Sequence, residues 1–356
     1  MPRDKAGNRQ DTEEHNAVGV MKNRYLVTGG DGFIGSALVR RLIADGHKVR
    51  VLDNDLRGSF RRLKDVSSNI EAVRADIRDH KAVLRACAGV DVICHLAFLN
   101  GTEFFYNKPE LVLDIGVKGM VNIIDGAIAE GVPELMLMSS SEVYQTPLHV
   151  PTDETAALSV PDPMNPRYSY GGGKIISELM AINYGRRYFK RVTIVRPHNV
   201  YGPDMGWEHV IPQFAVRMKR LCKDGGSVVR FPIQGSGRET RAFVYIDDFI
   251  DGLIRVLKRG EHLGIYHIGS DQETTIARVA DEVGRYFGKK VRLVPGKAAP
   301  GGTLRRCPDI SKMSRLGYVP RIRFAEGLRR TVEWYDRNAD LQPAKALKGH
   351  LWAEMR

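Results

Sequence analysis

Only four cysteines occur in the 356 residues of the chain, and they are widely separated. That number and spacing favour neither a disulfide framework nor a paired metal site. No apolar run approaches the length of about 18 residues that a transmembrane helix needs. Residues 1–20 are polar and of mixed charge, unlike a secretory signal. These absences predict a cytoplasmic protein with reduced thiols, no metal centre and no membrane partner.

Acidic residues are outnumbered by basic ones, 42 Asp and Glu against 54 Lys and Arg, which gives a formal net charge of +12. Such an excess would suit nucleic-acid binding if it were clustered. The basic residues are instead dispersed, and no basic stretch is interleaved with aromatic residues. We therefore expect no nucleic-acid partner, but a solvated surface whose excess charge can partly serve an anionic small substrate.

Short apolar segments alternate with amphipathic ones as far as residue 197. The expected strands are residues 24–28, 48–53, 70–75, 91–96, 135–140 and 191–196, and the expected helices are residues 33–45, 79–86, 111–130 and 169–189. This alternation predicts an α/β protein with a Rossmann-type, doubly wound parallel sheet. Further helices, expected at 212–223, 247–259, 275–287 and 324–337, predict a smaller C-terminal α/β lobe.

The two ends of the chain have low hydrophobicity and no clear periodicity. We therefore expect a flexible N-terminal extension at residues 1–22 and a loosely held tail at residues 338–356. Between them we place a Rossmann domain at residues 23–197 and a second lobe, mainly for substrate binding, at residues 198–337.

Gly29, Gly32 and Gly35 follow the first expected strand at the spacing of a dinucleotide-binding fingerprint. The first glycine permits a tight turn, the second lets the backbone approach a pyrophosphate, and the third lets helix and strand pack closely. The helix that opens with Phe33 and Ile34 would direct its amide N–H groups at the phosphates. The segment therefore predicts a dinucleotide cofactor.

Asp53 ends the second expected strand, where a carboxylate can accept hydrogen bonds from the adenosine ribose hydroxyls. It would repel a 2′-phosphate, so we expect NAD rather than NADP, although Arg57 nearby offers a group that could hold that phosphate. Further cofactor contacts are expected at the ends of strands, from Asn54, Asp76, Ile77, Leu96 and Ala97.

Tyr170 and Lys174 lie four residues apart in an expected helix and so share one face. A lysine ammonium beside the phenol favours the phenolate, which makes Tyr170 a candidate general base for an alcohol. Lys174 can also bind the nicotinamide ribose. Ser140, at the end of the fifth expected strand, lies where a hydroxyl can hydrogen-bond the same alcohol.

These motifs together resemble the extended short-chain dehydrogenases that modify nucleotide sugars, the NAD-dependent epimerase/dehydratase family. The resemblance covers residues 24–337. It rests on the glycine fingerprint, Ser-Ser-Ser-Glu-Val-Tyr at 139–144, the Tyr-x-x-x-Lys pair, Arg-Pro-His-Asn-Val-Tyr-Gly-Pro at 196–203 and the segment 235–247. It implies that Tyr170 starts an oxidation at C4 of a sugar, and that the chain forms a homodimer through the helices at 111–130 and 169–189. It also implies substrate contacts from Ser141, Asn199, Arg241 and Arg306, the last three at the diphosphate.

The net reaction depends on residues outside this shared core. Glu142, two residues after Ser140, could take a proton from C5, and dehydratases and decarboxylases resemble this chain in having Glu here. The segment around His209 is similar to 3,5-epimerases of the GDP-mannose type, which makes His209 a candidate acid or base. We place epimerisation through a 4-keto sugar first and 4,6-dehydration or UDP-glucuronate-type decarboxylation second. A non-catalytic NAD(H)-binding protein is a distant alternative.

Two departures from the family pattern involve glycine. Gly116 stands where the family commonly has Asn, and Gly171, Gly172 and Gly173 separate Tyr170 from Lys174. Because each glycine costs a helix about 1 kcal/mol relative to alanine, we expect close packing against substrate or cofactor. Their missing side chains predict a wider sugar pocket.

Overall fold

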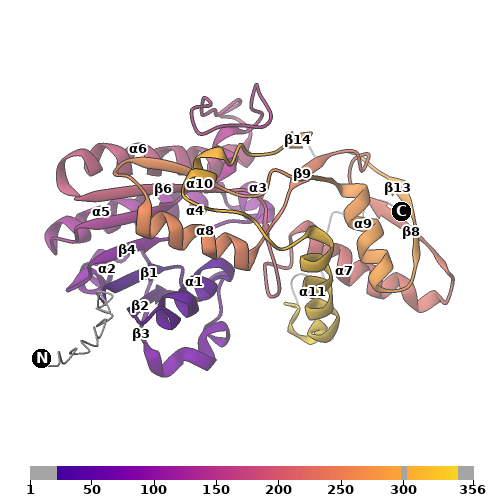
Figure 1. The fold of residues 1–356 in the computed structure, drawn as a ribbon, viewed down its shortest axis with the longest axis horizontal. Helices are drawn as coiled ribbons and strands as arrows, with labels where there is room; N and C mark the ends of the chain where they lie inside the picture. The colour runs from indigo at the N-terminus through magenta and orange to yellow at the C-terminus, as the bar shows by residue number, and fades with distance from the viewer. Residues whose placement is uncertain (1–21, 298–302, 344–356) are drawn as a thin grey trace, which may run out of the picture.

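The computed structural model describes residues 22–297 and 303–343, so the expected N-terminal extension and C-terminal tail lie almost wholly outside the described residues. Its centre is a seven-stranded sheet in the order β11-β6-β5-β4-β1-β2-β3, with every neighbouring pair parallel (Figure 1). The strands are β1 (Arg24–Thr28), β2 (Lys48–Asp53), β3 (Ile70–Arg74), β4 (Val92–His95), β5 (Glu134–Met138), β6 (Arg191–Pro197) and β11 (Gly264–Ile268). This order confirms the expected Rossmann-type α/β fold.

Helices cover both faces of this sheet, as a parallel sheet requires. Alternate strand residues point to opposite faces, so Val27 and Val51 join one apolar core while Leu26 and Leu52 join the other. Helices α1 and α8 pack together on the first face, and α2, α5 and α6 on the second. The bounds are α1 (Phe33–Ala44), α2 (His80–Cys87), α5 (Gly119–Ala129), α6 (Ser169–Tyr188) and α8 (Ile246–Arg259).

The helix expected at 111–130 is continuous but not uniform. It consists of α4 (Pro109–Leu113), a π-helical turn η2 (Asp114–Lys118) and α5, and a short helix α3 (Thr102–Asn107) precedes it. Within the π turn, a Cβ at Gly116 would lie 2.2 Å from the side chain of Phe98. Gly116 therefore lets this turn approach the segment that follows β4.

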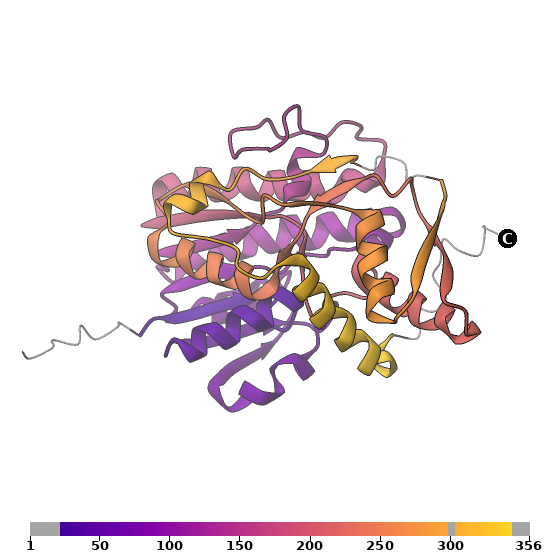
Figure 2. The ribbon, with the colours of Figure 1, turned by 45° about the vertical axis from the view of Figure 1, so that its right-hand side comes forward.

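The second lobe stands beside one end of the sheet, as Figures 1 and 2 show. It contains α7 (Val210–Leu221), α9 (Ile276–Tyr286), α11 (Phe324–Arg337), the paired strands β7 (Val200–Tyr201) and β10 (Val244–Tyr245), the pair β8 (Val228–Ile233) and β13 (Lys290–Pro295), and β9 (Thr240–Ala242) with β12 (Glu273–Thr275) and β14 (Arg305–Arg306). The chain also returns to the main sheet after residue 197, because β11 is its edge strand, α8 packs against α1 and β11, and the short helix α10 (Ser311–Arg315) packs against β11. The prediction that the helix at 247–259 belongs to the second lobe is therefore wrong.

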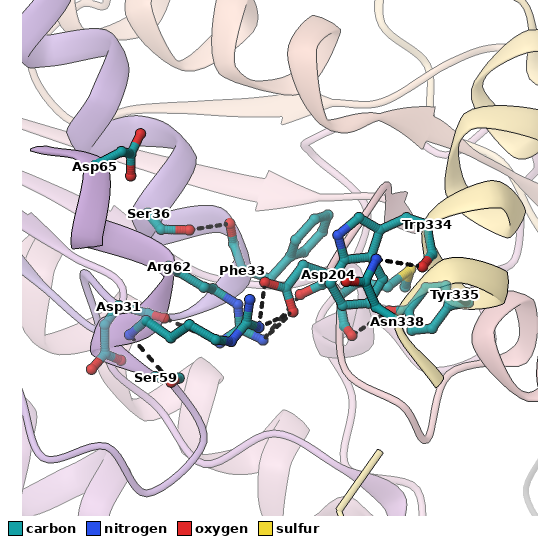
Figure 3. Close-up of polar contacts among 12 residues, drawn as sticks. Asp31, Phe33, Ser36, Ser59, Arg62, Asp65, Asp204, Trp334, Tyr335 and Asn338 are labelled. Atoms are coloured by element: carbon teal, nitrogen blue, oxygen red, sulfur yellow. Dashed lines mark hydrogen bonds and ion pairs between the residues drawn. The ribbon is translucent and has the colours of Figure 1, made fainter. Parts of the chain in front are cut away.

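A salt-bridge cluster ties the two lobes together. Arg61 and Arg62 belong to the 3₁₀ segment η1 (Phe60–Asn69), and both pair with Asp204 of the second lobe. The Nη2 atom of Arg61 donates to both Asp204 carboxylate oxygens, at 2.8 and 2.7 Å. Arg62 also donates to the carbonyl of Asp31 beside the glycine turn, at 3.2 Å. Figure 3 shows Arg62 and Asp204 pointing toward each other, near Tyr335 of α11.

Asp204→Asn should lower the free energy of unfolding by about 1–3 kcal/mol, because Arg62 would keep its partly buried charge without a carboxylate partner. The matched control is Asp65→Asn, since Asp65 also pairs with an arginine, Arg40, but its side chain is 60% exposed. That change should cost less than about 1 kcal/mol. Urea denaturation of both variants tests the difference, and equal losses would show that the Asp204 cluster stabilises the fold no more than an exposed ion pair does.

None of the helices within the described ranges is long and apolar enough to cross a membrane. Within the same ranges, no group of three or more His, Cys, Asp or Glu residues could hold a metal ion. The four cysteines are unpaired.

Candidate active site

Two glycines of the turn after β1 lie where a side chain would collide with the backbone. Gly29 has a φ of +70°, and a Cβ there would lie 2.8 Å from the Ala97 nitrogen. A Cβ at Gly35 would lie 2.0 Å from the Gly29 carbonyl oxygen. Gly32 caps α1, which begins at Phe33 and continues with Ile34, and the free N–H groups of this first turn suit a phosphate.

An open cleft of about 130 Å³ lies in front of this turn. It is lined by the predicted cofactor residues Gly29, Gly32, Asp53, Asn54, Asp76, Ile77, Leu96 and Ala97. At one end Asp53 accepts from the Asp55 amide at 3.1 Å, and Asn54 donates to Asp76 at 2.9 Å. The glycine turn fits the diphosphate of a dinucleotide, and the Asp53 carboxylate at this end fits its adenosine ribose.

Arg57, which could hold a 2′-phosphate, also lines this cleft. Its guanidinium pairs with Glu208 of the second lobe at 3.4 Å and lies 5.3 Å from the centroid of the Phe104 ring. Arg57 is thus partly held by Glu208, while Asp53 at the same end would repel a 2′-phosphate, which favours NAD.

Tyr170, Lys174 and Ser140 meet where β5 ends. Ser140 caps the 3₁₀ turn η3 (Ser141–Tyr144), accepts from the Glu142 amide at 3.1 Å and hydrogen-bonds the Tyr170 phenol. Lys174, one turn along α6 from Tyr170, donates from Nζ to the Met138 carbonyl at 2.7 Å. The expected trio thus lies together.

Burial controls the protonation of this pair. It raises the pKa of Tyr170, and the Ser140 hydrogen bond only partly opposes it. Burial also lowers the pKa of Lys174 to about 7, against the attraction of Glu178. Lys174 therefore gives up its proton near neutral pH. The expected lowering of the Tyr170 pKa by the Lys174 ammonium is not seen, since Lys174 is not among the causes of the Tyr170 shift. A proton passed from the phenol to a neutral Lys174 would give the phenolate, the form that suits removal of an alcohol proton.

Two of the three helix glycines face protein groups. A Cβ at Gly171 would lie 2.5 Å from the side-chain nitrogen Nε2 of Gln145, and one at Gly173 would lie 3.0 Å from Cζ of Phe98. The expectation that these glycines widen the sugar pocket is therefore wrong for Gly171 and Gly173. At Gly172 only Val160 lies near, at 3.6 Å, so the prediction stands there.

The predicted substrate residues also converge. Glu142 accepts from Nη1 of Arg306 at 2.6 Å, and Arg167 lies 3.9 Å away on its other oxygen. Strands β9 and β14 pair Arg241 with Arg306, and Asn199 donates to the Ala242 carbonyl at 3.2 Å. Ser141 is buried beside Glu142.

The charge around Glu142 is mainly positive. Burial is the largest influence on this carboxyl and raises its pKa, but Arg306, Arg167 and Arg241 together outweigh it, so the pKa lies below its usual range. Glu142 is therefore ionised beside three guanidinium groups, a set that also suits an anionic substrate. Arg167 was not expected from the sequence, since it lies in the irregular segment before α6.

His209 lies apart from this cluster. It is the N-cap residue of α7, and the charged groups that influence its pKa are Glu208 and Arg57, which lines the cofactor cleft. Burial lowers its pKa. Its assignment as an acid or base therefore remains a prediction.

A buried network under the site was also missed. Glu178 of α6 pairs with Arg196 of β6 at 2.6 Å and accepts from the Ser139 hydroxyl. Arg196 in turn donates to the Tyr144 hydroxyl, which contacts a His267 ring nitrogen at 2.6 Å. The network locks α6 to the ends of β5 and β6. Its sequence signal is the spacing of four residues between Lys174 and Glu178, which puts Glu178 on the catalytic face.

A family model described as the NAD-dependent epimerase/dehydratase family matches residues 25–269. The chain belongs to this family. It is 30% identical over 327 residues to the UDP-N-acetyl-alpha-D-glucosaminuronate decarboxylase of Bacillus cytotoxicus, which covers 88% of the chain and 98% of that relative. The dTDP-glucose 4,6-dehydratase of Streptomyces venezuelae, solved with NAD bound, matches with a TM-score of 0.78 at 34% identity, covering 89% of this chain and 98% of that one.

An epimerase of known structure is similar as well. The UDP-glucose 4-epimerase of Thermotoga maritima, solved with UDP-glucose, matches with a TM-score of 0.78 at 27% identity, covering 89% of this chain and 99% of that one. Membership of the NAD-dependent epimerase/dehydratase family establishes an NAD-dependent enzyme. The relatives include a decarboxylase, a dehydratase and an epimerase, so the net reaction must be argued from the site.

Proposed function

We propose that the protein is a nucleotide-sugar decarboxylase, which oxidises C4 of a nucleotide-linked uronic acid and releases its carboxylate as carbon dioxide. The observation that carries this proposal is the partly buried contact between Glu142 and Arg306, with Arg167 alongside and Ser141 next in the chain. The guanidinium groups offer partners for a sugar carboxylate, which for Arg306 replaces the diphosphate contact that the family resemblance implies. The decarboxylase among the relatives supports the same choice.

Tyr170 would begin the reaction by taking the proton of the C4 hydroxyl, with Ser140 hydrogen-bonded to the same oxygen. Bound NAD supplies the hydride acceptor at C4 and later returns the hydride, so no net redox change remains. Lys174 keeps the phenolate form of Tyr170 accessible near neutral pH.

The second stage would use Glu142 and Arg306. A ketone at C4 makes the sugar carboxylate a β-keto acid, so the C5–C6 bond can break with its electrons passing to the C4 oxygen. C5 then needs a proton. If Arg306 leaves Glu142 to bind the substrate carboxylate, the main influence that lowers the pKa of Glu142 is removed. Burial then raises this pKa. Glu142 would then take up a proton from solvent and deliver it to C5, after which Tyr170 returns its proton to the C4 oxygen.

Dehydration is the second candidate, because an ionised Glu142 suits removal of the C5 proton and a dehydratase is among the relatives. A leaving C6 hydroxyl, however, needs an acid, and the neighbouring position holds Ser141, whereas carbon dioxide leaves without one. Simple 4-epimerisation, placed first from the sequence, requires no carboxylate at position 142. A 3,5-epimerase would need a partner for Glu142, and the neighbours of His209 are Arg57 and Glu208 instead.

The test is incubation of the NAD-loaded enzyme with UDP-glucuronate, dTDP-glucose and UDP-galactose in deuterated water, with products read by NMR and mass spectrometry. We expect UDP-glucuronate to lose carbon dioxide and gain deuterium at C5. Loss of water from dTDP-glucose alone would replace the proposal by dehydration. Inversion of UDP-galactose at C4 without deuterium, with UDP-glucuronate unchanged, would replace it by epimerisation.

We also propose a homodimer through α5 and α6. Exposed apolar side chains lie on these helices, with Leu179 54%, Ile176 39% and Val121 38% exposed. Leu179→Glu should convert the dimer to a monomer in light scattering, because it would bury a charge in the interface. Val319→Glu is the control, since Val319 is 59% exposed on another part of the surface. A native chain that is already monomeric would contradict the dimer.

A further inference from the structure

One aromatic side chain fills the space left by two of the unusual glycines. A Cβ at Gly116 would lie 2.2 Å from Cζ of Phe98, and a Cβ at Gly173 would lie 3.0 Å from the same atom. Gly116 belongs to the π-helical turn and Gly173 to α6, so the ring is held between two helices. It thus lies where the family resemblance implies the side chain of an Asn.

The same ring faces the proposed catalytic pair. The Nζ atom of Lys174 lies 4.0 Å from its centroid, and the Tyr170 ring meets it edge-on, with centroids 5.2 Å apart and planes at 85°. An ammonium at this distance from an aromatic face is attracted by the ring quadrupole. Phe98 also lines the cofactor cleft, so its ring contacts both Lys174 and that opening.

We propose that Phe98 is a positioning residue that takes the place of the family's Asn: seated against Gly116 and Gly173, its ring holds the Lys174 ammonium and shields it from water. The inference rests on the proposed role of Tyr170 and Lys174 in the first oxidation. It is independent of which net reaction follows.

The other groups around Lys174 leave this role to Phe98. The Met138 carbonyl accepts one N–H, while Glu178 on the same helix is committed to Arg196 of β6. His95 of β4 is neutral, because burial and then the Lys174 charge lower its pKa to about 3. Tyr170 is the remaining titratable neighbour, on the same helix.

The ring acts on Lys174 in two opposite directions. It attracts the ammonium, which favours the charged form, and it keeps water away, which disfavours that form. Burial is the largest cause of the lowered pKa of Lys174, opposed by the charge of Glu178. Phe98→Ala admits water and should therefore raise the pKa of Lys174.

The first test follows Lys174 itself and needs no substrate. Lysine labelled with ¹³C at Cε reports the charge of each ammonium by NMR, and Lys174→Arg identifies the signal in the NAD-loaded enzyme. We expect a midpoint near 7 in the native protein and a rise of about one pH unit in Phe98→Ala. An unchanged midpoint in Phe98→Ala would overturn the proposal.

The second test asks whether Phe98 and position 116 exchange roles. Gly116→Asn alone should lower the melting temperature by more than about 5 °C, because its Cβ collides with the ring. The double variant with Phe98→Ala should recover at least half of that loss and move the Lys174 midpoint back toward its native value. Additive losses in the double variant would overturn the exchange.

Gly172→Ala is the matched control for the helix, since only Val160 lies near it, at 3.6 Å. Its effect should be the same in the native protein and in the Phe98→Ala variant. The rate at which UDP-glucuronate reduces bound NAD provides a third measurement, and we expect about a tenfold loss in Phe98→Ala with a shift of the pH profile to higher pH. If the native enzyme reduces no NAD with any sugar nucleotide, the proposed function fails, whereas the NMR midpoint still decides the role of Phe98.

Discussion

Tyr170→Phe should slow oxidation of the sugar by about 100- to 10,000-fold, because it removes the one hydroxyl that can take the C4 proton beside Ser140. The ring stays stacked on Phe105, with centroids 5.0 Å apart, so the fold and the cofactor cleft should be unaffected. Single-turnover absorbance of NADH measures the oxidation, and calorimetry measures NAD binding. Tyr184→Phe is the control, since Tyr184 lies exposed on the same helix.

The pH dependence of that oxidation in the native enzyme is a second test of Tyr170 and Lys174 as the base. Lys174 has a pKa lowered to about 7 by burial, so the pair loses its first proton near that pH. The active form has one proton fewer than the resting form, so the rate should rise with pH and level off above about 8. A rate that falls across this range, or a Tyr170→Phe variant as fast as the native enzyme, would show that another group takes the proton.

The features that the sequence predicts well are those set by local spacing. Gly29, Gly32 and Gly35 act within one turn, and Tyr170 and Lys174 within one turn of α6, so their geometry follows from the backbone alone. The same holds for the alternating strands and helices that give the parallel sheet. The return of β11 and α8 to this sheet was not predicted, because nothing local distinguishes them from the elements of the second lobe.

The features that the sequence predicts poorly depend on contacts between distant segments. The sequence predicts that Gly173 makes room for a sugar, but the ring of Phe98 lies in that space. Phe98 follows β4, far from Gly173 in the chain. Glu142 was recognised as a candidate base, yet its pairing with Arg306 joins residues 164 positions apart. Such pairings decide protonation and cavity shape, and only the folded chain brings them together.

Glu142→Gln should separate the two stages of the proposed reaction. The amide has nearly the same shape, and Arg306 can still donate to its oxygen, so oxidation at C4 should remain within about tenfold of the native rate. The amide cannot carry a proton to C5, so release of the decarboxylated product should fall about 100-fold or more. Bound NADH should therefore accumulate with UDP-glucuronate, as stopped-flow absorbance would show.

The control for Glu142→Gln is Glu110→Gln, an exposed position in α4, which should leave both stages unchanged. The two stages also distinguish the competing reactions, because epimerisation at C4 needs Ser140, Tyr170 and Lys174 but not Glu142. A Glu142→Gln enzyme that completes turnover of UDP-galactose at the native rate would leave Glu142 a structural partner of Arg306 and restore the epimerase interpretation. An enzyme that oxidises UDP-glucuronate and then stalls would instead assign to Glu142 the proton at C5, because Tyr170 and Lys174 remain intact in that variant.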